Sequence, residues 1–306
     1  MSSAFTWINP ISNPTHFGVF GRAGGDFLHA AGGSTSGTLM ETDLSQLPLP
    51  ILSLCLSRLC PADLPSMACA QAVCNTFRQA GFEALRDVKE VNLSPENRLT
   101  EIVLPQGAWL LKSIPAVKYL EAMNCSPFPL VKEVSACKHL VDLKLSHCNL
   151  SDVELVQILS TAHCQPTMPR LQKLSLESSG GAISGEGWLS KRTLPKLHTL
   201  NLAWCHNILP SGVAELGPQL QDIDLHGCSL VDDSVCENLK NVRFLDLCFT
   251  SVTDDGLKML VSAEAMVTLS LSADHSNLWV CGEWTNNGLI HLKQRRPDLE
   301  VILSSC

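Results

Sequence analysis

One pattern of apolar and polar positions recurs along most of the chain. Its clearest copy is the segment 140–148, LVDLKLSHC, in which Leu140, Leu143, Leu145 and Cys148 alternate with polar residues. Alternate side chains of a β-strand point to opposite faces, so Leu143 and Leu145 should point inward while the polar residues between and beside them face solvent. Each copy of the pattern therefore predicts a short strand with one buried face.

The same spacing returns at a regular interval. Six further copies begin at Val117, Leu171, Leu197, Leu220, Val242 and Met266. The starts lie about 22 to 31 residues apart, which is the period of leucine-rich repeats. Weaker copies flank the array at Val88, Val91 and Leu93 and at Leu299 and Ile302.

A helix is expected after each strand. Residues 151–154, SDVE, form a capping box, and Thr253 is followed by two aspartates that suit the positive end of a helix dipole. A single strand-turn-helix unit has only one apolar face, so the repeats must stack to be stable. The prediction for residues 82–306 is an α/β leucine-rich-repeat solenoid, with parallel strands on the concave face and helices on the convex face.

The first part of the chain has a different texture. Residues 1–43 are rich in Gly, Ser and Pro and predict a flexible tail. In residues 44–81, Leu52, Leu56 and Leu59 fall on one face of a helix, and a second helix is expected up to a glycine at the end of the segment. This small helical module is too short for a strong core of its own, so it should pack on the repeats or on a partner.

The module carries a recognisable motif. Its residues are Leu47-Pro48, Leu52, Leu56, Leu59, Asp63-Leu64, Val73-Cys74 and Phe77. They resemble the F-box, although Phe77 stands where that family usually has Trp and the stretch from Leu64 to Val73 is longer than usual. An F-box followed by cysteine-containing repeats is similar to the F-box/leucine-rich-repeat proteins.

That resemblance implies a function. Family membership implies a substrate receptor of an SCF ubiquitin ligase, in which the F-box docks to an SKP-type adaptor, and through it to a cullin-RING scaffold, while the repeats hold the client to be ubiquitinated. Carried over by position, the adaptor-binding residues are Leu47, Pro48, Leu52, Leu56 and Leu59. The alternative is a leucine-rich-repeat scaffold not linked to ubiquitination, whose module at 44–81 only caps the first repeat.

Composition narrows the class of partner and compartment. A net charge of −8 and a pI near 5.7 argue against sequence-independent binding to nucleic acid, which needs a basic face. Several of the fourteen cysteines occupy the same interior repeat position, which favours packed thiols over disulfides. With neither a signal peptide nor a membrane span visible, we expect a cytoplasmic or nuclear protein.

The sequence contains no pattern typical of catalysis. No Cys-x-x-Cys pair and no other metal-ligand spacing occurs, and no nucleotide-binding glycine motif follows a predicted strand. His147 precedes Cys148 and His206 follows Cys205, but both cysteines are repeat-core positions. We therefore expect a non-catalytic protein without cofactor or metal.

Candidate binding residues follow from the strand register. The stacked strands, about 4.8 Å apart, should form a ledge roughly 35 Å long. The candidate client-binding residues are His147, Asn201, Trp204, Asp224, His226, Arg243, Asp246 and Phe249 on the ledge, with Trp279 and Trp284 in a late insertion.

The aromatic residues are the strongest of these candidates. Trp204 and Phe249 occupy equivalent positions on either side of Gly227, and such a pair has the composition of an interaction hot spot. Alternatively, these rings pack under neighbouring loops. The insertion with Trp279 and Trp284 either contacts the client or covers the open end of the sheet.

Overall fold

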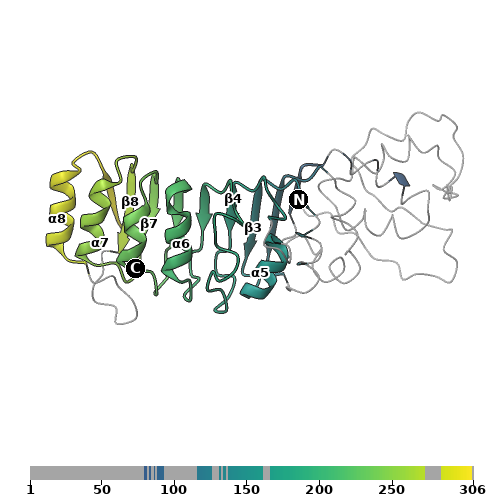
Figure 1. Ribbon diagram of the computed structural model, residues 1–306, viewed down its shortest axis with the longest axis horizontal. Coiled ribbons are helices and arrows are strands. Elements are labelled where there is room, and N and C mark those ends of the chain that lie inside the picture. The colour runs from purple at the N-terminus through teal and green to yellow at the C-terminus, as the bar shows by residue number, and fades with distance from the viewer. Residues whose placement is uncertain are drawn as a thin grey trace, which may run out of the picture.

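The described part of the chain is an elongated stack of strands and helices (Figure 1). This computed structural model describes residues 79–80, 83, 86, 88–92, 116–125, 131, 134–135, 137–160, 166–272 and 284–304. The predicted tail at 1–43 and nearly all of the predicted helical module at 44–81 lie outside these residues.

Nine parallel strands form one sheet, in which each strand pairs with the next one along the sequence. The strands are β1 (Glu90–Asn92), β2 (Tyr119–Met123), β3 (Asp142–Ser146), β4 (Lys173–Ser175), β5 (Thr199–Asn201), β6 (Asp222–Asp224), β7 (Phe244–Asp246), β8 (Thr268–Ser272) and β9 (Glu300–Ser304). The predicted parallel sheet is confirmed, and both weak flanking copies contribute strands to it.

The repeat leucines form columns inside the stack. Leu143, Leu174 and Leu200 pair in register on successive strands, and each is at most 1% exposed. Ile223 and Leu245 continue the column. Each buried side chain of this size contributes about 1.5–3 kcal/mol relative to an exposed one, so such a column stabilises the stacking of the repeats.

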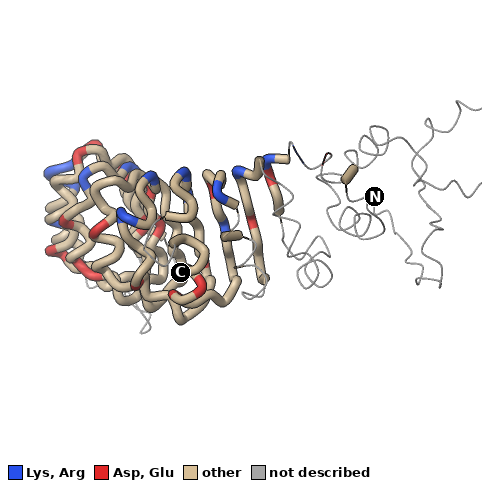
Figure 2. Tube along the Cα trace, turned by 45° about the vertical axis from the view of Figure 1, so that its right-hand side comes forward, with Lys and Arg blue, Asp and Glu red and all other residues tan. Residues whose placement is uncertain are grey.

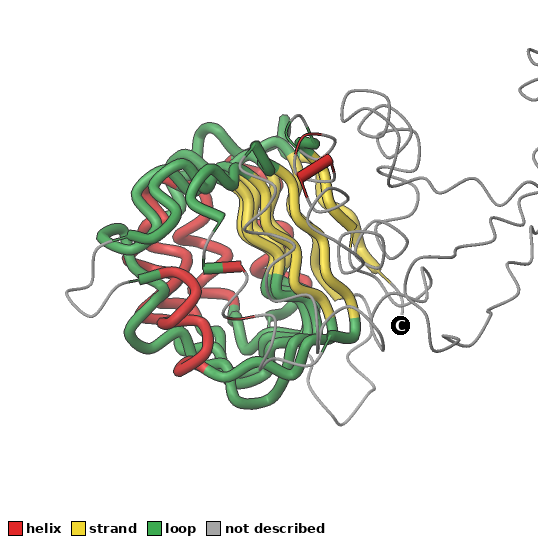
Figure 3. The backbone as a smooth tube through the Cα atoms, turned by 90° about the vertical axis from the view of Figure 1, so that its right-hand side faces the viewer, coloured by secondary structure: helices red, strands yellow, loops and turns green. Residues whose placement is uncertain are grey.

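Helical segments cover the side of the stack opposite the sheet (Figure 3). They are the α-helices α5 (Asp152–Leu159), α6 (Pro210–Leu216), α7 (Asp254–Met259) and α8 (Asn286–Arg295), with the 3-10 helices η4 (Gly217–Gln219), η5 (Asp233–Asn238) and η6 (Leu260–Ser262). The capping box at α5 is confirmed, because the Glu154 carboxylate accepts the Ser151 backbone N–H at 2.7 Å. The Thr253 cap of α7 is confirmed by its 3.2 Å bond from the Asp255 N–H.

The expectation of a helix in every repeat is wrong for one of the described repeats. The segment 176–198, described throughout, holds turns and no helix. There Trp188 and Leu189 are buried and fill the space that a helix fills elsewhere. Trp188 is held by a 2.7 Å hydrogen bond from its indole Nε1–H to a carboxylate oxygen of Asp152 in the preceding repeat.

The interior cysteines join neighbouring repeats. The Cys205 thiol donates to the carbonyl of Leu176 at 3.2 Å, and the Cys228 thiol donates to the carbonyl of Leu202 at 3.1 Å. Both side chains are free thiols with no exposed surface. The predicted packing role of this position is confirmed, and each thiol also satisfies a backbone acceptor of the repeat before it.

Aspartates at the starts of helical segments link the convex side. Asp233 accepts the backbone N–H of Thr253 at 2.7 Å and its hydroxyl at 2.6 Å. Asp254 accepts the same two groups of Thr285 at 2.6 and 2.7 Å. Each carboxylate thus holds the first turn of the next helix, so neighbouring repeats are fixed relative to one another.

The last strand departs from the predicted register by one residue. Leu269 pairs with Val301, and Ile302 is an exposed residue rather than the expected interior one. Nearby, the buried Arg296 donates to the carbonyls of Ala263 and Met266 at 2.5 and 2.8 Å. Its guanidinium closes the turn before β8.

Among the described residues, none of the helices combines the length and the apolar character needed to cross a membrane.

Candidate functional site

A single backbone conformation recurs where successive strands end. A positive φ marks the residue just before the cysteine position of six successive repeats, at Asn124, His147, Ser178, Trp204, Gly227 and Phe249. The chain turns there from the sheet toward the convex side. Gly and Asn adopt this left-handed conformation readily, whereas other residues lose about 1–2 kcal/mol in it.

Trp204 and Phe249 are therefore poor choices for the turn itself. Their φ angles are 62° and 58°, and bulky side chains are unusual in this region. Strain of this kind persists where another role of the side chain compensates for it. The two rings point to a function of this part of the ledge.

Four rings gather at the ends of β5, β6 and β7. We call Trp204, His206, His226 and Phe249 the aromatic cluster. The centroid of the His226 ring lies 4.8 Å from that of Trp204 and 5.1 Å from that of Phe249. Trp204 and Phe249 are stacked, with centroids 6.1 Å apart and planes inclined by 25°. Trp204 is 44% exposed, so the cluster is open to solvent despite its internal contacts.

Two carboxylates adjoin the aromatic cluster. Asn201, Asp224 and Asp246 are in register on β5, β6 and β7. In each case a side-chain oxygen accepts the backbone N–H two residues later, at 2.9, 3.1 and 2.8 Å respectively. These side chains shape the turn that presents the rings, so they have a structural role, and the binding role predicted for them stays a prediction.

The electrostatics of Asp224 are unfavourable in the isolated chain. Burial raises its pKa, and the neighbouring Asp246 carboxylate raises it further, against the lowering effect of the His226 N–H. His226 Nδ1 lies 3.8 Å from Asp246 Oδ1. Within the part of the chain that the structure describes, neither carboxylate is paired with a Lys or Arg.

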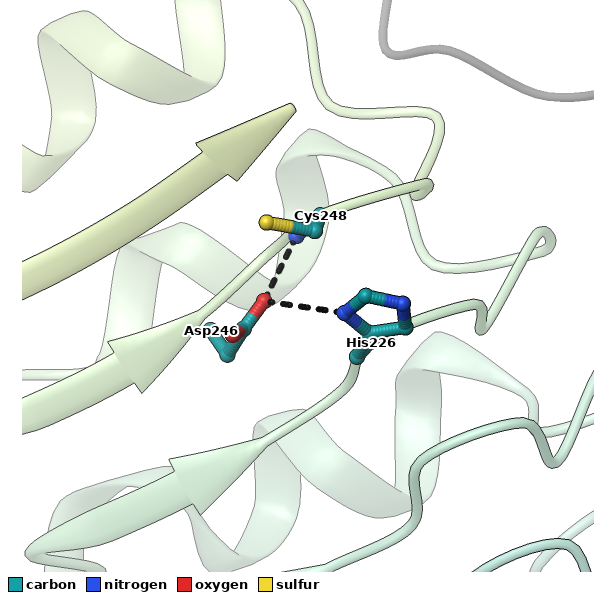
Figure 4. Close-up of side chains that lie close together, drawn as sticks. All are labelled: His226, Asp246 and Cys248. Carbon is teal, nitrogen blue, oxygen red and sulfur yellow. Dashed lines mark hydrogen bonds and ion pairs between the residues drawn. The ribbon is translucent and has the colours of Figure 1, made fainter. Parts of the chain in front are cut away.

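His226, Asp246 and Cys248 bring three metal-ligating types together, with donor atoms within 4.8 Å of one another (Figure 4). Asp246 Oδ1 already accepts the Cys248 N–H. Burial, assisted by the charge of Asp246, raises the pKa of the Cys248 thiol to about 12, which keeps it protonated. A structural Zn²⁺ site takes four ligands at about 2.0–2.3 Å, whereas this group offers three, one of which already accepts a backbone N–H, so we interpret the three residues as part of a turn.

The structure separates the other predicted site residues from this cluster. His147 is exposed in the equivalent turn after β3, and Arg243 precedes β7, at the strand end away from the rings. Trp284 is only 5% exposed and belongs to the core, so the structure does not present it on the surface of the ledge. Trp279 and the predicted adaptor-binding residues Leu47, Pro48, Leu52, Leu56 and Leu59 lie outside the described residues.

Sequence reasoning missed two members of the site. His206 donates its Nδ1–H to the carbonyl oxygen of Gly227 at 2.8 Å, and its ring meets Trp204 edge-on with centroids 5.9 Å apart. Cys248 contributes the N–H that orients Asp246. The only sign of them in the sequence is their spacing, two residues after Trp204 and two residues after Asp246. That spacing becomes informative only when the conformation of the turn is known.

Comparison with known proteins supports the repeat assignment. A family model described as leucine-rich repeat matches residues 136–153. The chain contains a leucine-rich repeat. The leucine-rich-repeat stack resembles a chain in the crystal structure of the Rad7 and Elc1 complex in yeast, with a TM-score of 0.56 and 18% identity. That match covers 75% of this chain and 58% of the other, so it spans less than two thirds of the yeast chain and shows a shared fold.

Two other solved structures match with lower TM-scores. A chain of the TLR13–ssRNA13 complex matches with a TM-score of 0.43 and 16% identity, covering 73% of this chain and 34% of that one. An internalin from Listeria monocytogenes matches with a TM-score of 0.39 and 15% identity, covering 82% and 57%.

Proposed function

We propose that this chain is a leucine-rich-repeat protein-interaction scaffold that binds a client on its ledge, and that it serves as the substrate receptor of an SCF-type ubiquitin ligase. The observation that carries the first part is the exposed, strained Trp204 beside Phe249 on the open face. Exposed aromatic residues of this kind are typical of interface hot spots.

The second part rests on residues 44–81. Their F-box-like motif, with Leu47-Pro48 at its start, would dock to the SKP-type adaptor and through it to a cullin-RING scaffold. The yeast structure of similar fold is itself a complex of two proteins, Rad7 and Elc1, which supports a role in an assembly. The compartment proposed is the cytoplasm or the nucleus, where such a ligase would meet its clients.

The proposed mechanism is proximity. Holding a client next to a charged ubiquitin-conjugating enzyme raises the effective concentration of its lysines near the reactive thioester. The receptor then contributes geometry and no catalytic residue of its own. The exposed rings and carboxylates of the ledge would set which client is held, while the 44–81 segment would set which ligase receives it.

A pull-down with purified SKP-type adaptor tests the ligase assignment. Wild type should bind, and Leu47→Ala combined with Pro48→Ala should remove binding while the circular dichroism spectrum stays unchanged. Val153→Ala is the matched control, because this exposed side chain on α5 belongs to the convex face. If wild type fails to bind, the scaffold not linked to ubiquitination becomes the better account.

A further inference from the structure

The outward face around the aromatic cluster is acidic. The strands β5, β6, β7 and β8 carry Asp222, Asp224 and Asp246 and contain no Lys or Arg. Arg243 stands just before β7, three residues from Asp246. Elsewhere on the described chain, acidic and basic residues are interspersed along the trace (Figure 2). A partner that complements this region must bring positive charge.

The carboxylates beside the rings have no Lys or Arg partner among the described residues, and their neighbouring basic group is His226, whose Nδ1 lies 3.8 Å from Asp246 Oδ1. Asp224 and Asp246 are direct neighbours across β6 and β7. Like charges at this spacing repel each other, and partial burial removes the water that would screen them. A cation supplied by a partner would offset both the repulsion between the carboxylates and the loss of their hydration. The arrangement of Asp224 and Asp246 therefore favours binding of a cation.

The shape of the aromatic cluster selects among cations. The ring centroids of Trp204, His226 and Phe249 lie 4.8 to 6.1 Å apart, so the rings contact one another and leave no space for an ammonium group between them. A methylated ammonium is best held by rings on several sides. A planar guanidinium stacks flat on one aromatic face and directs its N–H groups sideways, where carboxylates can accept them.

We propose that Trp204, His226 and Phe249, together with Asp224 and Asp246, bind an arginine side chain exposed on the client. The guanidinium would lie on the aromatic surface and donate hydrogen bonds to the two carboxylates. This inference rests on the proposed function of the ledge as the client-binding surface, and it is independent of how residues 44–81 bind the adaptor.

The experiment is a titration of the full chain, labelled with ¹⁵N at its tryptophans. The probe is N-acetyl-arginine methylamide, and the readout is the indole N–H resonance of Trp204, assigned from its loss in Trp204→Phe. Arginine should shift this resonance saturably. The citrulline analogue has the same length but no charge, and the lysine and trimethyl-lysine analogues have charge without the planar fork. Each should bind about tenfold more weakly than arginine.

Variants separate the two halves of the site. Asp224→Asn combined with Asp246→Asn should weaken arginine binding by about tenfold or more, because the amide keeps the turn but loses the charge. Asp142→Asn removes one charge from the same face at β3 and should leave binding unchanged. Tyr119→Ala removes an aromatic ring that is 43% exposed at the far end of the sheet and should also have no effect.

Three results would overturn the proposal. They are equal shifts with arginine and citrulline, equal or tighter binding of either lysine analogue, and arginine binding that survives loss of both carboxylates. Each is distinguishable from failure of the proposed ligase function, because the adaptor pull-down depends on the segment 44–81 and does not involve the probe. Loss of adaptor binding with intact arginine binding would leave the present inference standing.

Discussion

The indole ring of Trp204 lies directly over the backbone of Gly227. A β-carbon at residue 227 would come within 2.7 Å of a ring carbon of Trp204, closer than real side chains approach. Gly227 also has a φ of 73°. The glycine between the two aromatic repeats therefore lets Trp204 lie flat toward Phe249, and the exposed aromatic surface depends on it.

Replacing Gly227 by Ala should disturb the aromatic cluster. The left-handed turn alone should cost about 1–2 kcal/mol of stability, which is measurable by urea unfolding. The indole resonance of Trp204 should also no longer shift when the arginine probe is added, because the displaced ring no longer forms part of the aromatic cluster. Gly181→Ala is the control, since a β-carbon there meets nothing closer than 4.0 Å. An unchanged Trp204 resonance in Gly227→Ala would contradict this account.

Asp224→Asn should make the chain more stable at neutral pH. Asn201 already fills the equivalent position and accepts the same backbone N–H, so an amide can hold the turn. Burial raises the pKa of Asp224, and the ionised form is therefore a liability of the folded state. The variant should unfold at a higher urea concentration than wild type at pH 7.

The difference in stability between Asp224→Asn and wild type should depend on pH with a definite sign. The pKa of Asp224 in the folded chain is above the unfolded value of about 3.9, so the destabilisation is complete above the folded pKa. It fades as the pH falls through the folded pKa and vanishes once both states are protonated. A difference between variant and wild type that persists unchanged at pH 3 would show that charge is not its cause.

Asp152→Asn, unlike Asp224→Asn, should make the chain less stable at neutral pH. Burial alone would raise the pKa of Asp152, but bonds from the Ser184 hydroxyl, the Trp188 indole and the backbone of Ser184 and Gly185 lower it overall. An amide cannot accept all of these donors, and buried donors left unpaired cost about 2–3 kcal/mol. Urea unfolding at pH 7 measures this loss.

The stability supplied by the Asp152 charge is present above the unfolded pKa of about 3.9 and is lost as the pH falls through the lower folded pKa. The gap between Asp152→Asn and wild type should therefore narrow in acid. Asp255→Asn, which removes an exposed ion pair with Lys258 and one negative charge in the first turn of α7, should change stability by about 1 kcal/mol or less. A comparable loss of stability in Asp152→Asn and Asp255→Asn would contradict the claim that the hydrogen bonds accepted by Asp152 stabilise the fold.

The core thiols should be unreactive while the chain is folded. Burial raises the pKa of Cys205 to about 11 and that of Cys236 to about 12, against an ordinary value of about 8.5. Alkylation by iodoacetamide needs the thiolate, so both sites should react more than about a hundredfold slower in native chain than in guanidinium. Peptide mass spectrometry reads each site. Rapid native labelling of Cys205 would argue against its interior position.

Much of the fold follows from the spacing of apolar residues. Leucines two apart predict a strand with one buried face, and Leu143 and Leu145 are buried on β3 as predicted. The recurring cysteine predicts an interior turn position, and Cys148 is buried there. The pattern is strong because every repeat restates it. The convex side has no such period, so the turns around Trp188 and the 3-10 helix η5 could not be told from α-helices.

The candidate site was only partly predictable. Register placed Trp204 and Phe249 at equivalent positions, but their contact with His226 depends on the left-handed turn and on the space above Gly227. Neither property is encoded in hydrophobic pattern. The burial of Trp284 could not be predicted, because the sequence of an irregular insertion does not indicate whether an aromatic residue faces solvent or core.

Hydrogen exchange of the full chain with and without purified SKP-type adaptor tests the central claim, that adaptor and client use different parts of the chain. We expect slower exchange in peptides from residues 44–81 and unchanged exchange in peptides from residues 204–249. Protection of 204–249 by the adaptor, or no protection of 44–81 at saturating adaptor, would contradict it.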